Sequence, residues 1–265
     1  TPNPGPCLPS CTISGGTPDL TNTNLFHSFE QLSVPTNGIA IFEHSPTIRN
    51  IVARVTGDQS STIDGLIRTS STYNSANLFL LNPNCIVFGP KGGLDIGGSF
   101  VATTADAVQF GAAGSFSTIN LNDAPTLLTV NPSAFLFTQG TPQPIINQSI
   151  APNPALPFIV DGLKVQEGKS LILLGGDVIL ERDSNSALTN LSVQAPGGRI
   201  ELGGVTSPST VGLNINEDNL SLSYEENALL ADVVINDARL EVSSRSGDRA
   251  GDITINANTF SLNAS

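Results

Sequence analysis

The sequence predicts an all-β protein folded as a parallel β-solenoid, a stack of coils of about 20 residues each, with an N-terminal cap and excursions outside the stack. Three observations lead to this class. Only 13% of the 265 residues are charged, too few for the surfaces of helical bundles, while 25 Gly and 18 Pro favour turns. A short internal repeat recurs at a fixed spacing. Within each repeat, apolar and polar residues alternate as in a strand with one buried face.

The repeat is clearest near the C-terminus, where residues 212–216, 232–236 and 252–256 align at a constant spacing. Two runs separated by small polar residues make one coil, and stacked coils pair each strand in parallel with its equivalent. A lone unit cannot bury its apolar side chains, so stacking is what stabilises it. A weaker echo with a longer spacing aligns Ile172 and Leu174 with Ile200 and Leu202, which predicts an inserted loop at 183–190.

One polar residue type recurs at the corner of this repeat. Asn216, Asn236 and Asn256 occupy equivalent positions, and stacking would let their side-chain amides form a hydrogen-bonded ladder. The alternative is that Asn merely suits a turn, and the two readings are compatible. We predict the ladder.

The N-terminal half carries shorter, less regularly spaced strand-like runs. They lie at residues 39–42, 48–55, 76–81, 86–88, 94–101 and 107–110. Five prolines between residues 141 and 157 cannot donate to a sheet, so this stretch predicts an excursion. No helix of any length is needed to account for the sequence. The chain therefore divides into a capped core over 1–110, an irregular Pro-rich excursion over 111–160 and regular coils over 161–265, all within one β-helix domain.

The charge balance limits the kinds of partner that the protein can bind. The net charge is −12 and only three residues are Lys, so nucleic acid and anionic membranes are poor partners. No apolar run approaches the roughly 20 residues that span a bilayer, which predicts a soluble protein. The start at Thr1-Pro2-Asn3-Pro4 carries no signal-like stretch and indicates a processed or trimmed terminus. A monomer is expected.

The three cysteines do not form a metal pattern. Cys7 and Cys11 are spaced for a local disulfide, which suits an oxidising compartment, although free thiols are the alternative. Cys85 is then a small buried hydrophobe, or else the true partner of one of the other two. No cofactor is implied.

Four strings in the N-terminal half are more specific than the periodicity. They are residues 24–29 (NLFHSF), 51–57 (IVARVTG), 63–65 (IDG) and 77–84 (NLFLLNPN). Together they resemble the N-terminal secretion domain of filamentous haemagglutinin-type exoproteins, the haemagglutination activity domain of two-partner secretion in Gram-negative bacteria. The resemblance is closest over residues 15–110, looser to 204, and beyond that consists only of solenoid repeats. The chain's end, which stops inside the repeat pattern, agrees with a fragment of a longer exoprotein.

The resemblance implies both a fold and a partner. The fold is a right-handed, single-stranded parallel β-helix with an N-terminal cap. The partner is an outer-membrane β-barrel transporter whose periplasmic domains recognise the secretion domain. The protein would then pass through the periplasm to the cell surface or the medium, begin β-helix folding there, and leave adhesion to host or surface glycans to downstream regions.

The resemblance also marks candidate secretion residues. The family's Asn-Pro-Asn-Gly motif falls on Asn82, Pro83, Asn84 and Cys85, and the last position departs from it. Asn followed by Pro favours a type I turn in which the Asn side chain caps a later amide. We expect Cys85 to be tolerated because the fourth position need not have positive φ. The turn is either a rigid link between strands or a direct transporter contact.

The string at residues 24–29 supplies a second set of candidates. Asn24, Leu25, Phe26, His27 and Phe29 are either exposed recognition groups or, as we expect, residues packed into a cap over the first coil. Elsewhere in the marked strings, Arg54 and Asp64 are expected to form an ion pair between neighbouring coils.

Three other functions are known uses of a β-solenoid. A polysaccharide-active β-helix enzyme needs converging carboxylates, whereas the densest acidic patch here, Glu217, Asp218, Glu225 and Glu226, lies on turns without a basic partner before Arg239. We therefore predict no enzyme. A calcium-stabilised solenoid needs a recurring motif, and residues 92–95 supply one imperfect copy. A surface adhesin or glycan-binding solenoid stays open as the alternative.

Overall fold

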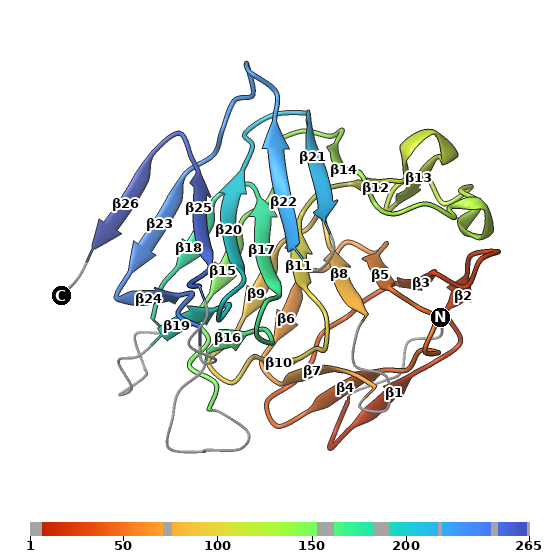
Figure 1. Ribbon diagram of the computed structural model, residues 1–265, viewed down its shortest axis with the longest axis horizontal. Helices are drawn as coiled ribbons and strands as arrows, with labels where there is room; N and C mark the ends of the chain where they lie inside the picture. Colours follow the sequence, from red (N-terminus) through yellow and green to blue (C-terminus); the bar gives the residue numbers. More distant parts are fainter. Residues whose placement is uncertain are drawn as a thin grey trace.

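A computed structural model of the chain describes residues 7–70, 76–152, 162–182, 191–216, 219–244 and 249–263. Nearly all of its regular structure is β (Figure 1). Within those ranges the helical segments are two single 3-10 turns, η1 (Gly111–Ala113) and η2 (Pro125–Leu127). No helix among the described residues is long and apolar enough to cross a membrane.

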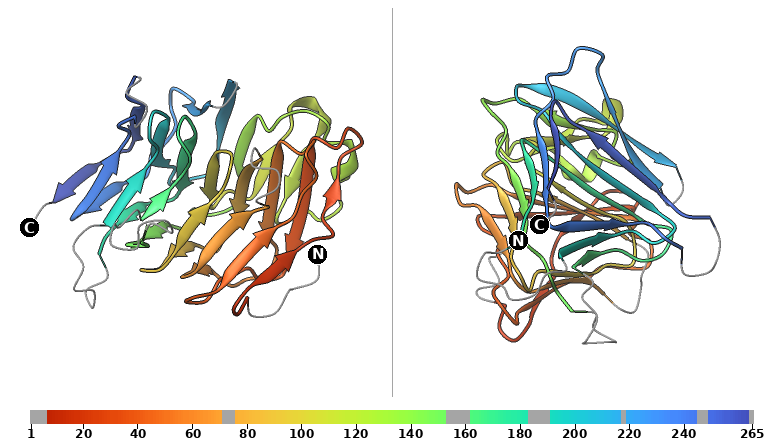
Figure 2. Two further views of the ribbon diagram at one scale, coloured as in Figure 1. Left: turned by 60° about the horizontal axis from the view of Figure 1, so that its bottom comes forward. Right: turned by 90° about the vertical axis from the view of Figure 1, so that its left-hand side faces the viewer.

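Parallel sheets stack the coils in chain order from the N-terminal to the C-terminal end (Figure 2). The largest sheet has eight strands, in the order β2 (Thr17–Pro18), β3 (Asn24–Phe29), β5 (Asn50–Val55), β8 (Asn77–Leu81), β11 (Phe100–Thr103), β17 (Ser170–Gly175), β20 (Arg199–Gly204) and β25 (Asp252–Asn256). All its neighbours pair in parallel except β2, which runs antiparallel to β3 and covers the N-terminal edge.

Three further parallel sheets complete the sides of the stack. A six-stranded sheet contains β26 (Phe260–Asn263), β23 (Val233–Asn236), β18 (Val178–Leu180), β15 (Ile145–Asn147), β9 (Ile86–Phe88) and β6 (Ser61–Ile63). A four-stranded sheet contains β1 (Cys11–Ile13), β4 (Ile39–Phe42), β7 (Leu66–Thr69) and β10 (Gly93–Asp95). A three-stranded sheet contains β16 (Leu163–Lys164), β19 (Leu191–Gln194) and β24 (Ala238–Glu241). The fold is therefore β-helix-like, as the repeats predict.

A fifth, antiparallel sheet lies against the eight-stranded one. Its strands are β13 (Ser115–Ser117), β12 (Ala107–Gln109), β14 (Ala134–Phe137), β21 (Ser209–Asn216) and β22 (Asn219–Tyr224). Two apolar clusters result. The first lies inside the solenoid and the second between the two sheets. Because both faces of the large sheet are covered, every residue of β5 and of β17 is buried.

The predicted coil length is wrong, because the coils are longer than the C-terminal repeat suggests. Asn24 lies beside Asn50 and Asn50 beside Asn77, and these pairs are separated by 26 and 27 positions in the sequence. The three segments that define the repeat belong to β21, β23 and β25, in three different sheets. Alternation identifies a half-buried strand without saying which sheet it joins. The weaker echo is off by one position, because Leu171 pairs with Ile200.

Two predicted elements also differ. The run at 94–101 is two strands, β10 and β11, separated by a corner. The Pro-rich stretch after residue 141 is not wholly an excursion, since β15 pairs in parallel with β9 and β18 despite the flanking prolines. Pro154 and Pro157 of that stretch, like the loop predicted at 183–190, lie outside the described residues.

Candidate functional site

The turn formed by Asn82, Pro83, Asn84 and Cys85 joins β8 to β9 and is fastened to the coil beneath it. The Asn82 side chain is fully buried and donates to Gln59 O and to Ser61 Oγ, each at 2.9 Å. Its Oδ1 accepts the Asn84 amide at 2.9 Å, the side-chain cap that the sequence predicts. Asn84 Nδ2 donates to Gly57 O at 2.8 Å. Both amides therefore hold neighbouring coils together.

Cys85 contradicts the expectation for the fourth position. Its φ is +103°, a conformation that glycine adopts easily and side-chain-bearing residues do not. The glycine of the family motif thus fits this backbone better than cysteine does. The thiol is free and half-buried, and burial raises its pKa.

The strand Asn24–Phe29 is not an exposed recognition segment. Asn24, Leu25, Phe26, His27 and Phe29 are all buried. Phe26 faces the second apolar cluster, with its ring 5.4 Å from that of Phe110. Phe29 points into the solenoid core, where it stacks with His27 at 5.9 Å between ring centroids. Burial lowers the pKa of His27 to about 4, so the imidazole is neutral near pH 7.

A polar ladder runs across successive coils at the start of the large sheet's strands. Asn50 Nδ2 donates to Asn24 Oδ1 at 2.8 Å, and Asn77 Nδ2 donates to Asn50 Oδ1 at 3.0 Å. At the N-terminal end, Asn24 Nδ2 donates to Asp19, Leu128 O and Val130 O.

The same ladder continues toward the C-terminus through hydroxyl groups. The Ser99 amide donates to Asn77 Oδ1 at 2.8 Å, the Ser170 amide to Ser99 Oγ at 2.9 Å, and the Leu220 amide to Ser170 Oγ at 2.9 Å. In each of the five steps that lead from Asn24 to Leu220 the later residue donates to the earlier one. The ladder therefore has one direction along the chain.

The amide ladder predicted at 216, 236 and 256 is wrong in its members. Asn216 lies opposite Asn219 in the β21–β22 hairpin, and Asn256 lies beside Gly203. Asn236 does accept an amide bond, at 2.8 Å, but from Asn263 at an exposed site. The observed members were visible in the sequence as an Asn that opens each of the strings NLFHSF, NIVARV and NLFLL.

Arg54 pairs with Asp123 rather than with Asp64. Both members of the pair are buried. Arg54 also donates to Ser117 O and, through Nε, to Ser28 Oγ at 2.8 Å, and its guanidinium lies 3.8 Å from the centroid of the Phe116 ring. Asp64 instead accepts the Lys91 amide of the next coil at 2.8 Å. Arg54 therefore ties the antiparallel sheet to the solenoid.

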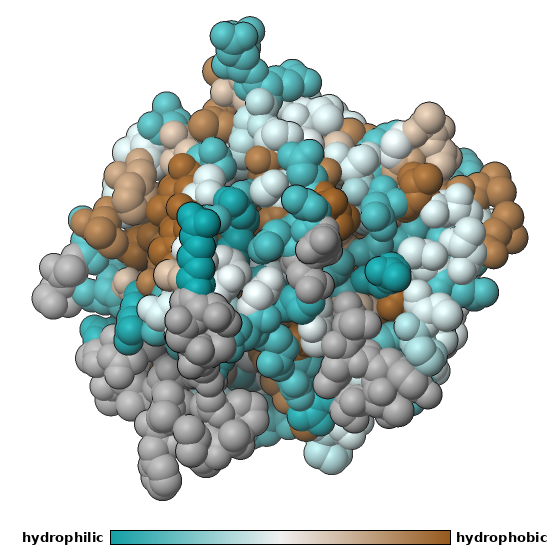
Figure 3. Space-filling model, in the orientation of Figure 1, coloured by the Kyte–Doolittle hydropathy of each residue, from teal (hydrophilic) through white to brown (hydrophobic). Residues whose placement is uncertain are grey.

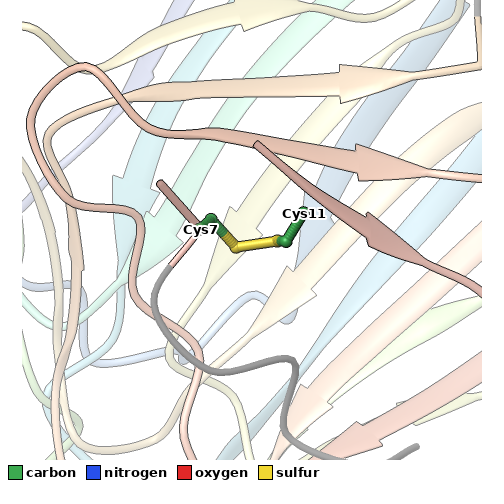
Figure 4. Close-up of a disulfide and its surroundings, with 2 residues drawn as sticks. All are labelled: Cys7 and Cys11. Carbon is green, nitrogen blue, oxygen red and sulfur yellow. A yellow bond between two sulfur atoms is a disulfide. The ribbon is translucent and has the colours of Figure 1, made fainter. Parts of the chain in front are cut away.

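Near the N-terminus, a disulfide joins Cys7 and Cys11 (Figure 4). Cys7 is buried against the first coils, and β1, which begins at Cys11, pairs with β4. Of the predicted acidic patch, Glu217 and Asp218 fall outside the described residues. Across the described ranges, no three His, Cys, Asp or Glu side chains gather as metal ligands would.

The turn at residues 82–85 borders a groove. Pro83 and Asn84 line a hollow of about 750 Å³ together with Ile119 and Leu121, whose side chains are about half exposed. Residues of β5, of β14 and of the segments that follow β5, β11, β13 and β14 complete it.

The chain is similar to known secretion domains. The family model described as the TPS secretion domain matches residues 10–255. Among solved structures, the HMW1 secretion domain from Haemophilus influenzae is similar with a TM-score of 0.57 and 17% identity, over 95% of this chain. The chain spans 63% of that structure's length. No curated protein sequence matches the chain.

Proposed function

Because this chain belongs to the TPS secretion domain family, we propose that it carries the export address of a large two-partner secretion exoprotein. In this proposal an outer-membrane β-barrel transporter binds the chain through its periplasmic domains and passes it to the cell surface or the medium. The N-terminal coils then nucleate a right-handed, single-stranded β-helix outside the cell. The domain performs no catalysis itself.

The observation that supports the nucleation step is the polar ladder, which connects successive coils. Each folded coil presents a side-chain oxygen as acceptor, and the following coil supplies the amide donor. The series runs from Asn24 through Asn50 to Asn77. Asp64 repeats the arrangement at another corner by accepting the Lys91 amide. A coil that folds onto its neighbour thus finds its hydrogen-bond partner already in position, and in our proposal the N-terminal end, where β2 covers the large sheet, supplies the first such neighbour.

The two ends of the described stack differ in how their edge strands are covered. At the N-terminal end, β2 closes the large sheet by antiparallel pairing. At the other end, β25 and β26 are the outermost described strands of their sheets. Apolar side chains gather over this end in Figure 3, and Ile253, Phe260 and Leu262 are exposed there. The covered N-terminal end is therefore the end at which our proposal places the start of folding.

Export itself is tested by expressing the chain with a signal peptide, with and without a candidate transporter, and measuring its appearance in the medium. We expect export only with the transporter. Equal export without it would overturn the address.

Nucleation is tested by refolding kinetics. Asn50→Ala in the second coil is expected to slow refolding, whereas Ile235→Ala, which removes a buried side chain of β23 in a late coil, is expected mainly to accelerate unfolding. Equal slowing of refolding by both variants would overturn growth from the N-terminal end.

The turn needs a separate control, because its amides also stabilise the fold. Asn84→Ala is compared with Asn50→Ala. Both variants remove a side-chain amide that donates to the preceding coil, but Asn50 lies at the start of β5, away from the turn. If the transporter reads the turn, Asn84→Ala loses export at a stability at which Asn50→Ala is still exported. Parallel loss of export and stability in both variants would assign the turn a structural role alone.

A further inference from the structure

The groove beside the turn at residues 82–85 exists only in the folded domain, because two separate parts of the chain form its walls. Corners of the solenoid after β5, β8 and β11 form one wall, and the segments after β13 and β14 form the other. Pro83 lies on the first wall, and the half-exposed side chains of Ile119 and Leu121 lie on the second. A hollow of about 750 Å³ can hold a few residues of a partner's chain.

Asp106 places a carboxylate on the first wall. The residue is only 6% exposed, and its Oδ2 accepts the amides of Thr138 and Gln139 and the Thr138 hydroxyl. These contacts cap the loop after β14 and hold the carboxylate in place. They leave Oδ1, which accepts no hydrogen bond from the described residues and is not enclosed by protein. Because Asp106 lines the groove, this oxygen faces the space inside it.

The charge of the groove is negative. Among the described residues that line it, none is Lys, Arg or His, whereas the exposed Asp58 adds a second carboxylate. The protein as a whole, at a net charge of −12, attracts cations and repels anions. A carboxylate oxygen binds a positively charged donor more strongly than a neutral one. Because Asp106 is already held by three hydrogen bonds, little of its freedom is lost when a ligand binds.

The contacts of Asp106 favour an ammonium group over a guanidinium group. Arginine binds a carboxylate best through two parallel hydrogen bonds, one to each oxygen, but Oδ2 is already occupied. A lysine ammonium is a compact point charge for which one oxygen suffices. On the opposite wall, Ile119 and Leu121 offer apolar surface to the lysine stem and to the residues beside it. The groove therefore fits a lysine with an apolar neighbour.

We propose that the groove of the folded domain binds a lysine-containing segment of a basic partner protein, with the ammonium on Asp106 Oδ1 and an apolar neighbour against Ile119 and Leu121. A basic partner complements the net charge of −12, which a second copy of the chain does not. The periplasmic domains of the transporter are not this partner, because the groove forms only once the domain has folded. The inference goes beyond the export address, and its test is independent of the export assay.

The test uses the full chain, isotope-labelled for NMR, and short synthetic peptides with blocked ends. One peptide carries Leu-Lys-Leu between Gly and Ser residues, and matched peptides replace the Lys by acetyl-lysine or both Leu by Ser. Binding is followed through the amide shifts of Thr138 and Gln139, which donate to Asp106 and report on the groove. We expect the Leu-Lys-Leu peptide to bind and each matched peptide to bind about tenfold more weakly.

Two variants separate the charge from the apolar contact. Asp106→Asn keeps an oxygen for the loop amides and turns an amide donor toward the groove, so the Leu-Lys-Leu peptide should bind about tenfold more weakly. Glu225→Gln removes one negative charge at an exposed site outside the groove, and should change the affinity by less than about twofold. Leu121→Ser should weaken binding of the Leu-Lys-Leu peptide but not of a blocked single lysine.

Binding of the Leu-Lys-Leu peptide to Asp106→Asn as tightly as to the parent would overturn the assignment of Oδ1. Leu121→Ser changes only a half-exposed side chain, so an unchanged affinity in that variant overturns the proposal even if Asp106→Asn does not fold. A blocked single lysine that binds as tightly as the peptide would make a small amine the ligand and overturn the partner protein. Shift changes confined to residues outside the groove, or no binding of the peptide, would also overturn the site.

Discussion

Asn50 donates its side-chain amide to Asn24 at 2.8 Å and accepts that of Asn77 at 3.0 Å, so one buried residue connects three successive coils. It also donates to Asn131, which lies in the segment leading to β14. Removing this side chain leaves acceptors and a donor without partners inside the protein, where water cannot replace them.

We therefore expect Asn50→Ala to lower the free energy of unfolding by about 2 kcal/mol or more. The control is Asn236→Ala, which also removes an amide contact between coils, but at an exposed site where water replaces it. Its cost should stay below about 0.5 kcal/mol. Urea denaturation of both variants measures the difference. Equal costs would show that the buried ladder contributes no special stability.

The sequence predicts the class of fold and several strands, but not the register. Residues 39–42 and 86–88 are strands with the predicted bounds, because their apolar runs end at clear turn residues. The coil length could not be found from alternation, since the large sheet is buried on both faces. Ile172 and Leu171 of β17 face different apolar clusters, so neither position reveals which one meets Ile200.

In the candidate site, too, contacts between residues that are near in sequence could be predicted and distant contacts could not. The Asn82 side-chain cap is predictable because it depends on two residues that are near in sequence. The partner of Arg54 is not, since Asp123 lies 69 positions away in a segment that only the antiparallel sheet brings near. The positive φ of Cys85 was missed because the residue type gave no signal for it.

Replacing Cys85 by glycine should stabilise the protein. At a φ of +103° a residue with a Cβ atom is strained, whereas glycine is not. Cys85→Gly is expected to raise the free energy of unfolding by about 1 kcal/mol, even though glycine adds entropy to the unfolded chain. Cys85→Ala removes the thiol but keeps Cβ, and should bring no such gain. Urea denaturation separates the two, and equal effects of both variants would refute strain at this position.

Removing one member of the buried Arg54–Asp123 pair should be costly. Arg54→Ala leaves Asp123 buried without a counter-charge and removes the contact with the Phe116 ring, for a loss of about 3–5 kcal/mol. The control is Arg68→Ala. Arg68 pairs with Asp95 at 2.7 Å, but both side chains are about a third exposed or more, so its loss should cost less than about 1 kcal/mol. Thermal unfolding measures both, and similar midpoints would contradict the role of Arg54 as a tie between the sheets.

Acid should weaken the first coils through His27. Its pKa is lowered from 6.5 to about 4 in the folded protein because burial disfavours the charged imidazole. The unfolded chain therefore binds more protons between these values. Stability is fully present above pH 6.5 and declines as the pH falls toward about 4, by up to about 3 kcal/mol. In His27→Gln, which cannot titrate, this part of the pH dependence should disappear while carboxylate effects remain. Urea denaturation at intervals from pH 7 to 4.5 measures both slopes, and an unchanged slope in the variant would assign the acid sensitivity to other groups.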